Sequence, residues 1–292
     1  MIVKTELNRN SLTLYSKTSH IDVGYDILYE VQGKKRTAME YTKEKVRELL
    51  TELAEPEYAK FSGSLLGREA AMLGVRLPKI RELAKKVAKA DGKEYLESTL
   101  PARKAGADTE EKAASDMKYM EELMLYGMTI GCMKGKLEEL FPYIERYVAR
   151  VDNWSLCDSF CAGLKQTKKQ PEAMWDFLQP YLHSDREFDL RFGVVMLMDF
   201  YVMPEYIDEL LEIFDGIHHE GYYVKMAVAW ALSVCLVKQW EKSYAYMSAS
   251  ENHLDDFTYA KTVQKCRESY RLTAEQKEML TALKESRLQT GR

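Results

Sequence analysis

Apolar residues recur at intervals of three and four from Met39 almost to the C-terminus, and this spacing indicates amphipathic helices. The first such stripe consists of Val46, Leu49, Leu50 and Leu53. In three of the more apolar helical segments, Trp154, Arg191 and Trp230 occupy similar places, 37 and 39 residues apart. A period of about 38 to 40 residues with two helices in each unit predicts a HEAT-like solenoid of stacked helix pairs.

The composition agrees with an all-α fold. The chain of 292 residues contains only 15 Gly and 7 Pro, whereas proteins built from many strands and turns usually need more of both. Pro56 is expected to end the first helix, and the polar residues 91–108 are expected to hold short helices and loops. The longer expected helices cover residues 79–90, 110–133, 137–148, 154–164, 172–182, 186–201, 204–214, 222–237 and 241–249.

Residues 1–38 differ in pattern from the rest of the chain. Two stretches, 11–16 and 21–31, alternate loosely between apolar and polar residues and contain residues that favour strands. This segment is expected to form either a hairpin or a loose extension. We therefore divide the chain into an N-terminal extension, residues 1–38, and a helical domain, residues 39–292.

Several classes of protein are excluded by composition. The first ten residues are largely polar and contain no continuous apolar run, so we expect no secretory signal peptide. The longest apolar run, 222–237, contains a lysine and is too short to span a bilayer. Five scattered cysteines fit reduced thiols better than a disulfide framework. We expect a cytoplasmic monomer without a membrane partner. The net charge of −4 argues mildly against nucleic-acid binding, although a local basic face can lie on an acidic protein.

The first candidate site residues are Trp154 and Asp158. Asp152 or Asn153 is a natural cap for the helix that follows, and this places Trp154 in its first turn. Asp158 follows four residues later, so the two side chains share one face. In a purely structural reading, Trp154 anchors the core and Asp158 pairs with a base on a neighbouring helix.

The next two repeats contain Arg191 and Trp230. The helix that follows Arg191 is apolar nearly all round, so this arginine requires an anionic partner or a ligand phosphate. Asp158, one repeat earlier, is the obvious partner, and a plain salt bridge between repeats is the structural alternative. Trp230 lies among small residues, where a tryptophan is usually part of the core.

A basic cluster lies near the C-terminus, with Glu268 as the only acid among its members. These are Lys261, Lys265, Arg267 and Arg271. The cluster suits either a phosphate backbone or a solvated helix face. No zinc-ligand set, P-loop or Gly-rich dinucleotide motif is present, so we expect neither a metal nor an organic cofactor.

Five segments in this order resemble the AlkD-like DNA alkylation repair family. They are Gly74–Arg81 (GVRLPKIR), Asp152–Asp158 (DNWSLCD), Leu190–Gly193 (LRFG), Ala229–Trp230 (AW) and Gln264–Arg271 (QKCRESYR). The resemblance covers about Met39 to Leu283, and residues 1–38 match nothing in it.

The resemblance implies a DNA glycosylase that excises cationic N3- or N7-alkylated purines from duplex DNA without flipping the base into a pocket. In this family the active cleft holds two tryptophans, an aspartate and an arginine, and Trp154, Asp158, Arg191 and Trp230 match those positions. Two other functions stay open. One is a non-catalytic paralogue that binds damaged or unusual DNA, and the other is a HEAT-like scaffold for protein partners.

Overall fold

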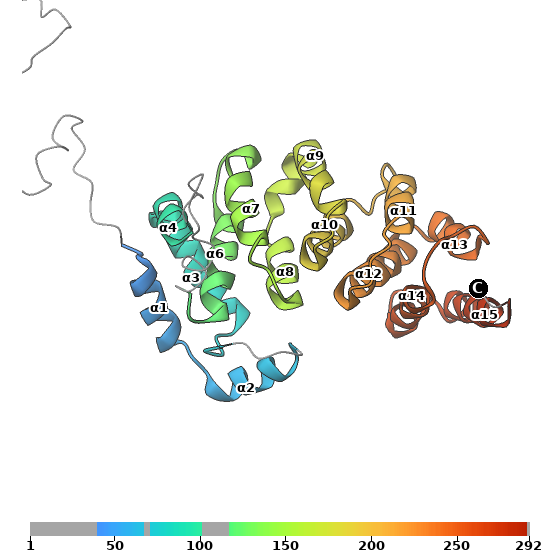
Figure 1. Ribbon diagram of the computed structural model, residues 1–292, viewed down its shortest axis with the longest axis horizontal. Coiled ribbons are helices and arrows are strands. Elements are labelled where there is room, and N and C mark those ends of the chain that lie inside the picture. The colour runs from blue at the N-terminus through green and yellow to red at the C-terminus, as the bar shows by residue number, and fades with distance from the viewer. Residues whose placement is uncertain (1–39, 67–70, 101–116, 291–292) are drawn as a thin grey trace, which may run out of the picture. The chain divides into compact units, whose positions relative to one another are not determined.

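The computed structural model describes residues 40–66, 71–100 and 117–290 (Figure 1). The chain divides into two units, Met1–Ala38 and Met39–Arg292. The suggested hairpin within residues 1–38 lies outside the described residues. The N-terminal part of the helix expected at 110–133 lies outside them as well.

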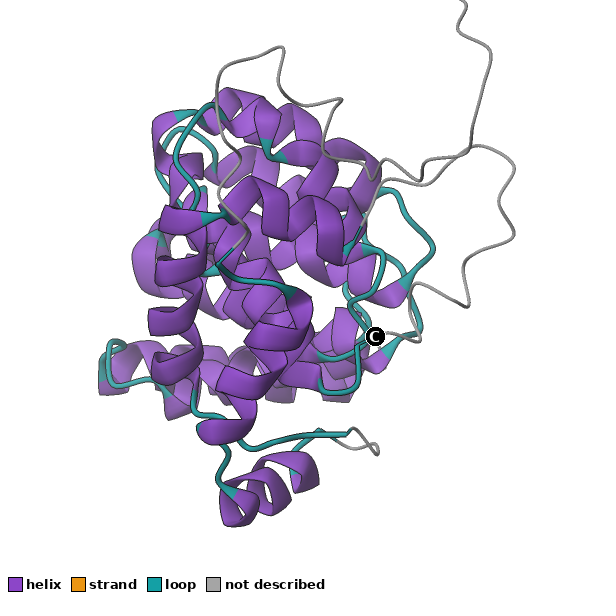
Figure 2. Cartoon of the chain, turned by 90° about the vertical axis from the view of Figure 1, so that its left-hand side faces the viewer, coloured by secondary structure: helices purple, strands orange, loops and turns teal. Residues whose placement is uncertain are grey.

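All regular elements among the described residues are helices, and Figure 2 shows no strand there. The all-α prediction is therefore confirmed. The α-helices are α1 (Lys43–Glu52), α2 (Pro56–Ser64), α3 (Leu77–Ala90), α4 (Gly92–Thr99), α6 (Met120–Cys132), α7 (Phe141–Val148), α8 (Trp154–Cys161), α9 (Pro171–Leu182), α10 (Glu187–Phe200), α11 (Ile207–Asp215), α12 (Tyr222–Lys238), α13 (Trp240–Ser248), α14 (Asp256–Glu268) and α15 (Ala274–Thr290). Two 3₁₀ helices, η2 (Leu137–Glu139) and η3 (Lys165–Lys169), precede α7 and α9.

Two differences from the expected helices have local causes. The expectation that residues 117–119 are helical is wrong, because Tyr119 is extended and the Glu122 carboxylate accepts hydrogen bonds from the amides of Lys118 and Tyr119. These bonds define the start of α6. Pro56 was expected only to end a helix, but it also begins α2, since proline is well suited to the first position of a helix.

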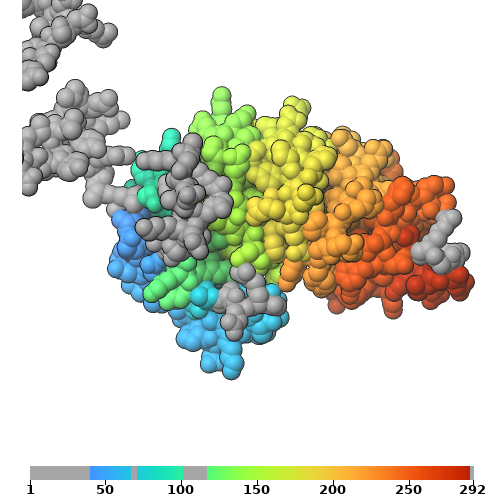
Figure 3. Space-filling model, in the orientation of Figure 1, coloured from blue at the N-terminus to red at the C-terminus, as the bar shows by residue number. Residues whose placement is uncertain are grey.

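The helices form two rows, as stacked helix pairs do. The inner row consists of α3, α6, α8, α10, α12 and α14, and each of these helices packs against the next. The outer row consists of α4, α7, α9, α11, α13 and α15 (Figure 1). In the space-filling view, successive colours adjoin along residues 117–290 (Figure 3). Successive helix pairs are therefore neighbours along the stack.

Buried aromatic rings hold the middle of the inner row in place. Tyr126 on α6 stacks on Tyr147 of α7, which packs on Phe160 of α8, and Phe160 stacks on Phe192 of α10. All four side chains are almost completely buried. Such rings contribute both buried area and specific geometry, so they fix α8 relative to α10.

Across the described ranges, no helix is both long and apolar enough to cross a membrane.

Candidate functional site

The centre of the candidate site is an ion pair between α8 and α10. The Asn153 side chain accepts the amide of Leu156 at 3.0 Å, which caps α8 and sets Asp158 one turn further on. Arg191 Nε and Nη2 donate to the two carboxylate oxygens of Asp158 at 3.0 and 2.8 Å. The predicted partnership of Asp158 with Arg191 is thus present, in the bidentate geometry that guanidinium and carboxylate groups favour.

Arg191 is the more buried partner of the pair. Its side chain is 7% exposed, whereas that of Asp158 is 20% exposed. Arg191 Nη1 donates to the main-chain carbonyl of Tyr223 at 2.8 Å. Burial disfavours the charge on Arg191, but the hydrogen bonds and the charge of Asp158 outweigh burial and raise the pKa of the guanidinium. Asp158 is therefore the member of the pair that has more access to solvent and to a ligand.

Trp154 lies one turn before Asp158 and is half-buried. Its indole Nε1 donates to the carbonyl of Leu65, just beyond the end of α2, at 3.3 Å. The ring is therefore not simply a core anchor, because its polar edge is tied to a helix that lies 89 residues away in the sequence.

Trp230 lies on α12, two turns after Tyr223, and is half-buried. The Lys265 ammonium on α14 lies 5.9 Å from the centre of the Trp230 ring, within cation–π range. Burial lowers the pKa of Lys265; Arg191 acts in the same direction, and Asp158 opposes it. Lys265 therefore contacts Trp230 directly and interacts with the ion pair only through longer-range electrostatics.

The four members of the predicted basic cluster have different surroundings. Lys261 lies one turn before Lys265, and its ammonium is 5.8 Å from the ring centre of Phe257. Arg267 is exposed in the last turn of α14, and Arg271 is exposed beyond its end. The structure thus brings Lys265 to Trp230 and Lys261 next to Lys265, but among the described residues neither arginine contacts Asp158, Arg191 or either tryptophan.

A family model for DNA alkylation repair enzymes matches residues 46–265, about three quarters of the chain. The chain belongs to the DNA alkylation repair enzyme family. The resemblance noted in the sequence is confirmed at the level of the family. The matched region contains the ion pair, both tryptophans, Lys261 and Lys265, whereas Arg267 and Arg271 lie beyond it. A search of curated proteins found no match to this chain.

Two further groups of basic side chains in this repair-family protein were not predicted from the sequence. Lys168 in η3 and Lys238 at the end of α12 both lower the pKa of Asp199, which lies in the last turn of α10. Burial raises the pKa of Cys132 at the end of α6, and three cations oppose this shift: Lys85, Arg81 and Lys165. None of these five cations forms an ion pair with another described residue. The basic run at 165–169 was the signal available in the sequence.

Asp199, in the last turn of α10, has a half-buried carboxyl. Burial raises its pKa to about 6, and the charge of Asp158 acts in the same direction, while Lys238 and Lys168 oppose the shift. Since the folded-state pKa lies above the unfolded value, ionisation of Asp199 costs stability as the pH rises from about 4 to about 7.

We therefore expect Asp199→Asn to stabilise the protein more at pH 8 than at pH 5. The gain at pH 8 should be about 1 to 2 kcal/mol, less than the pKa shift alone implies, because part of the carboxyl faces water. Urea unfolding at the two pH values measures it. An equal gain at both pH values would show that ionisation of Asp199 does not reduce the free energy of unfolding.

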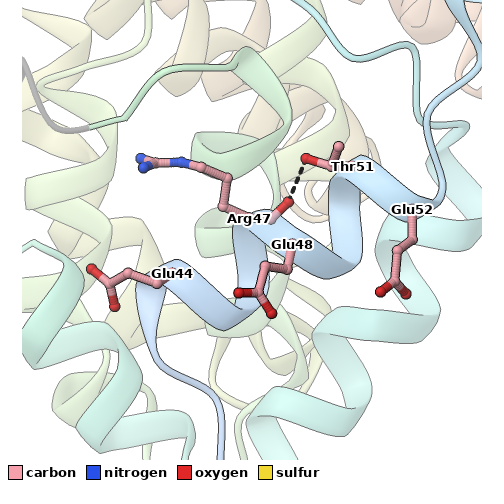
Figure 4. Close-up of a pocket in the computed structure, with 5 residues that line it drawn as sticks. All are labelled: Glu44, Arg47, Glu48, Thr51 and Glu52. Atoms are coloured by element: carbon pink, nitrogen blue, oxygen red, sulfur yellow. Dashed lines mark hydrogen bonds between the residues drawn. The ribbon is translucent and has the colours of Figure 1, made fainter.

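A separate depression lies along α1, with a volume of about 520 Å³ (Figure 4). Its lining residues are Glu44, Arg47, Glu48, Thr51 and Glu52. The guanidinium of Arg47 is bound to the buried Glu122 at 2.9 and 3.0 Å. The other charged groups that line this depression are carboxylates, and one of them, Glu48, is paired with Lys45. It does not suit a phosphate backbone. Within the described ranges, no group of three or more His, Cys, Asp or Glu side chains could hold a metal ion.

Proposed function

We propose that this protein is a DNA glycosylase that releases cationic N3- or N7-alkylated purines from duplex DNA. The observation that carries the proposal is the carboxylate of Asp158, oriented through both oxygens by the buried Arg191 and placed one turn from Trp154. Membership of the repair family supports DNA as the partner.

The proposed reaction needs no acid. An alkylated purine already carries a positive charge, so it leaves neutral when it takes the electron pair of the glycosidic bond. The sugar then becomes oxocarbenium-like at C1′, and water adds there and loses a proton. The Asp158 carboxylate stabilises the sugar cation and orients the water. Trp154 and Trp230 contribute ring faces that attract the developing positive charge.

Arg191 acts mainly by orienting Asp158 in this mechanism. Three of its five N–H donors are used by Asp158 and by the Tyr223 carbonyl, which leaves two. Contact between Arg191 and a backbone phosphate stays a prediction. The bidentate pairing of Asp158 with Arg191 also favours the second candidate function, a non-catalytic DNA-binding protein, because the same geometry suits a purely structural ion pair.

Binding of duplex DNA should depend on the four basic residues near the C-terminus. Replacing Lys261 and Lys265 with Gln should reduce the slope of log K against log salt by about 2, since each phosphate contact contributes about 0.9. Replacing Arg267 and Arg271 should have a similar effect. Filter binding to undamaged duplex at several salt concentrations measures the slope.

The matched control replaces Lys277 and Lys284 with Gln, because both lie on α15 in the outer row. This pair removes the same charge and should leave the slope unchanged. If every variant of the basic cluster kept the wild-type slope, the cluster would be only a solvated surface.

The base-release proposal is tested with duplexes that contain either N7-methylguanine or uracil. Free 7-methylguanine should appear, while uracil should stay in the duplex, because the site offers no acid to protonate a neutral leaving base. Efficient uracil excision would contradict this mechanism, and DNA binding without release of either base would favour the non-catalytic alternative.

A further inference from the structure

Helix α2 lies at the candidate site although it is poorly held by apolar packing. None of the side chains of α2 is buried. Phe61 in the helix is 60% exposed, and Leu65, directly after its last residue, is 54% exposed. A helix of nine residues is only marginally stable by itself in water. Specific polar contacts must therefore contribute to its position.

The N-terminal end of α2 is anchored to the start of α3. The Glu55 carboxylate forms ion pairs with Arg76 and Lys79 at 2.8 and 2.9 Å, and the Glu55 amide donates to the carbonyl of Leu73. Gly74 has a φ of +80°, and a Cβ at this position would collide with the backbone of the first turn of α2. This close approach fixes one end of the helix.

The C-terminal end of α2 is held by two side chains from the inner row. The carbonyl of Leu65 accepts from the indole of Trp154 at 3.3 Å, and the carbonyl of Leu66 accepts from the hydroxyl of Tyr223 at 3.2 Å. Carbonyls at the end of a helix have no partners within the helix. Leu66 is almost completely buried, so its carbonyl has little access to water as a substitute.

These contacts close a ring of hydrogen bonds around the candidate site. Asp158 binds Arg191, and Arg191 donates to the main-chain carbonyl of Tyr223. The hydroxyl of the same tyrosine holds Leu66, and the preceding carbonyl holds Trp154, one turn before Asp158 on α8. The amide of Tyr223 is itself fixed by the Glu187 carboxylate at 2.7 Å.

We propose that Tyr223 is a positioning residue for base release, and that it acts on Trp154 through the end of α2. This inference rests on the proposed glycosylase function. The hydroxyl holds Leu66 in place, and this keeps the Leu65 carbonyl where it orients the indole of Trp154. Loss of the hydroxyl lets the end of α2 move, so the ring that faces the sugar is less well oriented. Small displacements of a positioned group reduce reaction rates strongly.

The test is Tyr223→Phe, which removes the hydroxyl but leaves the main-chain carbonyl that Arg191 uses. The single-turnover rate of 7-methylguanine release should fall about fivefold to tenfold, with the Kd for the duplex unchanged. Hydrogen exchange of the amides of α2 should become several times faster. Tyr222→Phe is the matched control, because Tyr222 is 56% exposed and its hydroxyl has no hydrogen-bond partner among the described residues.

A double-variant cycle separates positioning from a general structural role. Trp154→Phe keeps an aromatic ring but removes the N–H that binds Leu65. If Tyr223 acts through this bond, Tyr223→Phe should reduce the rate less than twofold in the Trp154→Phe background. Independent, multiplicative effects of the two substitutions would overturn the inference.

Hydrogen exchange also separates this inference from the proposed function. It needs no reaction, so unchanged exchange in α2 of Tyr223→Phe overturns the inference whether or not base is released. If the wild-type protein releases no alkylated base, the proposed function fails and the positioning role fails with it. Faster exchange in α2 of Tyr223→Phe would then establish only that the Tyr223 hydroxyl holds the end of this helix.

Discussion

Replacing Asp158 with asparagine is expected to lower the rate of alkylpurine release by a factor of about 10² to 10³, the range seen when one preorganised electrostatic group is removed from an active site. Asparagine has the shape of aspartate and retains one carbonyl oxygen to accept a bond from Arg191. The negative charge that stabilises the sugar cation is lost. Single-turnover release from duplex DNA measures the rate, and circular dichroism checks the fold.

The control for this substitution is Asp176→Asn on the outer helix α9. Asp176 is exposed, so the change alters the net charge by the same amount without touching the ion pair. Its release rate should equal that of the wild type. A folded Asp158→Asn protein with unchanged turnover would show that Asp158 is structural.

The second large effect concerns stability. Asp158→Ala should reduce the free energy of unfolding by about 3 to 5 kcal/mol, because it leaves the guanidinium of Arg191 buried without its anionic partner. The loss should exceed that of Asp158→Asn, which retains one acceptor. Urea unfolding of the three proteins gives the comparison.

The double variant Asp158→Ala/Arg191→Met identifies the origin of that loss. It removes both charges, and the methionine fills part of the space left by the arginine, so most of the stability should return. If the losses of the two single variants simply add in the double variant, the uncompensated charge is not the cause. The packing of α8 against α10 would then be responsible.

Local signals in the sequence were sufficient for much of the fold and for the centre of the site. The three- and four-residue spacing located most of the helices, because each amphipathic helix must bury one face whatever its neighbours are. Asp158 and Arg191 could be paired from the sequence because a charge beside an apolar helix needs a partner of opposite sign. Their positions in successive repeats then placed the two side chains on adjacent helices.

The contacts of Tyr223 and α2 could not be predicted in the same way. The hydroxyl of Tyr223 binds a main-chain carbonyl 157 residues earlier in the chain, and any residue type could supply that carbonyl. The pattern of side chains in the sequence therefore does not predict this hydrogen bond. α2 itself has no buried face, so it lacks the apolar stripe that identifies the other helices. The basic groups around Asp199 and Cys132 were not predicted because their members come from separate helical segments.

The role of Asp158 in the release of cationic alkylpurines can be measured on damaged DNA itself. Duplex DNA that contains N7-methylguanine or N3-methyladenine is incubated with excess wild-type protein or with Asp158→Asn, and the free base and the abasic sites are both quantified. We expect equal amounts of base and abasic site with the wild type, and release at least about a hundredfold slower with Asp158→Asn. Wild-type protein that binds these duplexes but releases neither base above the spontaneous rate would contradict it.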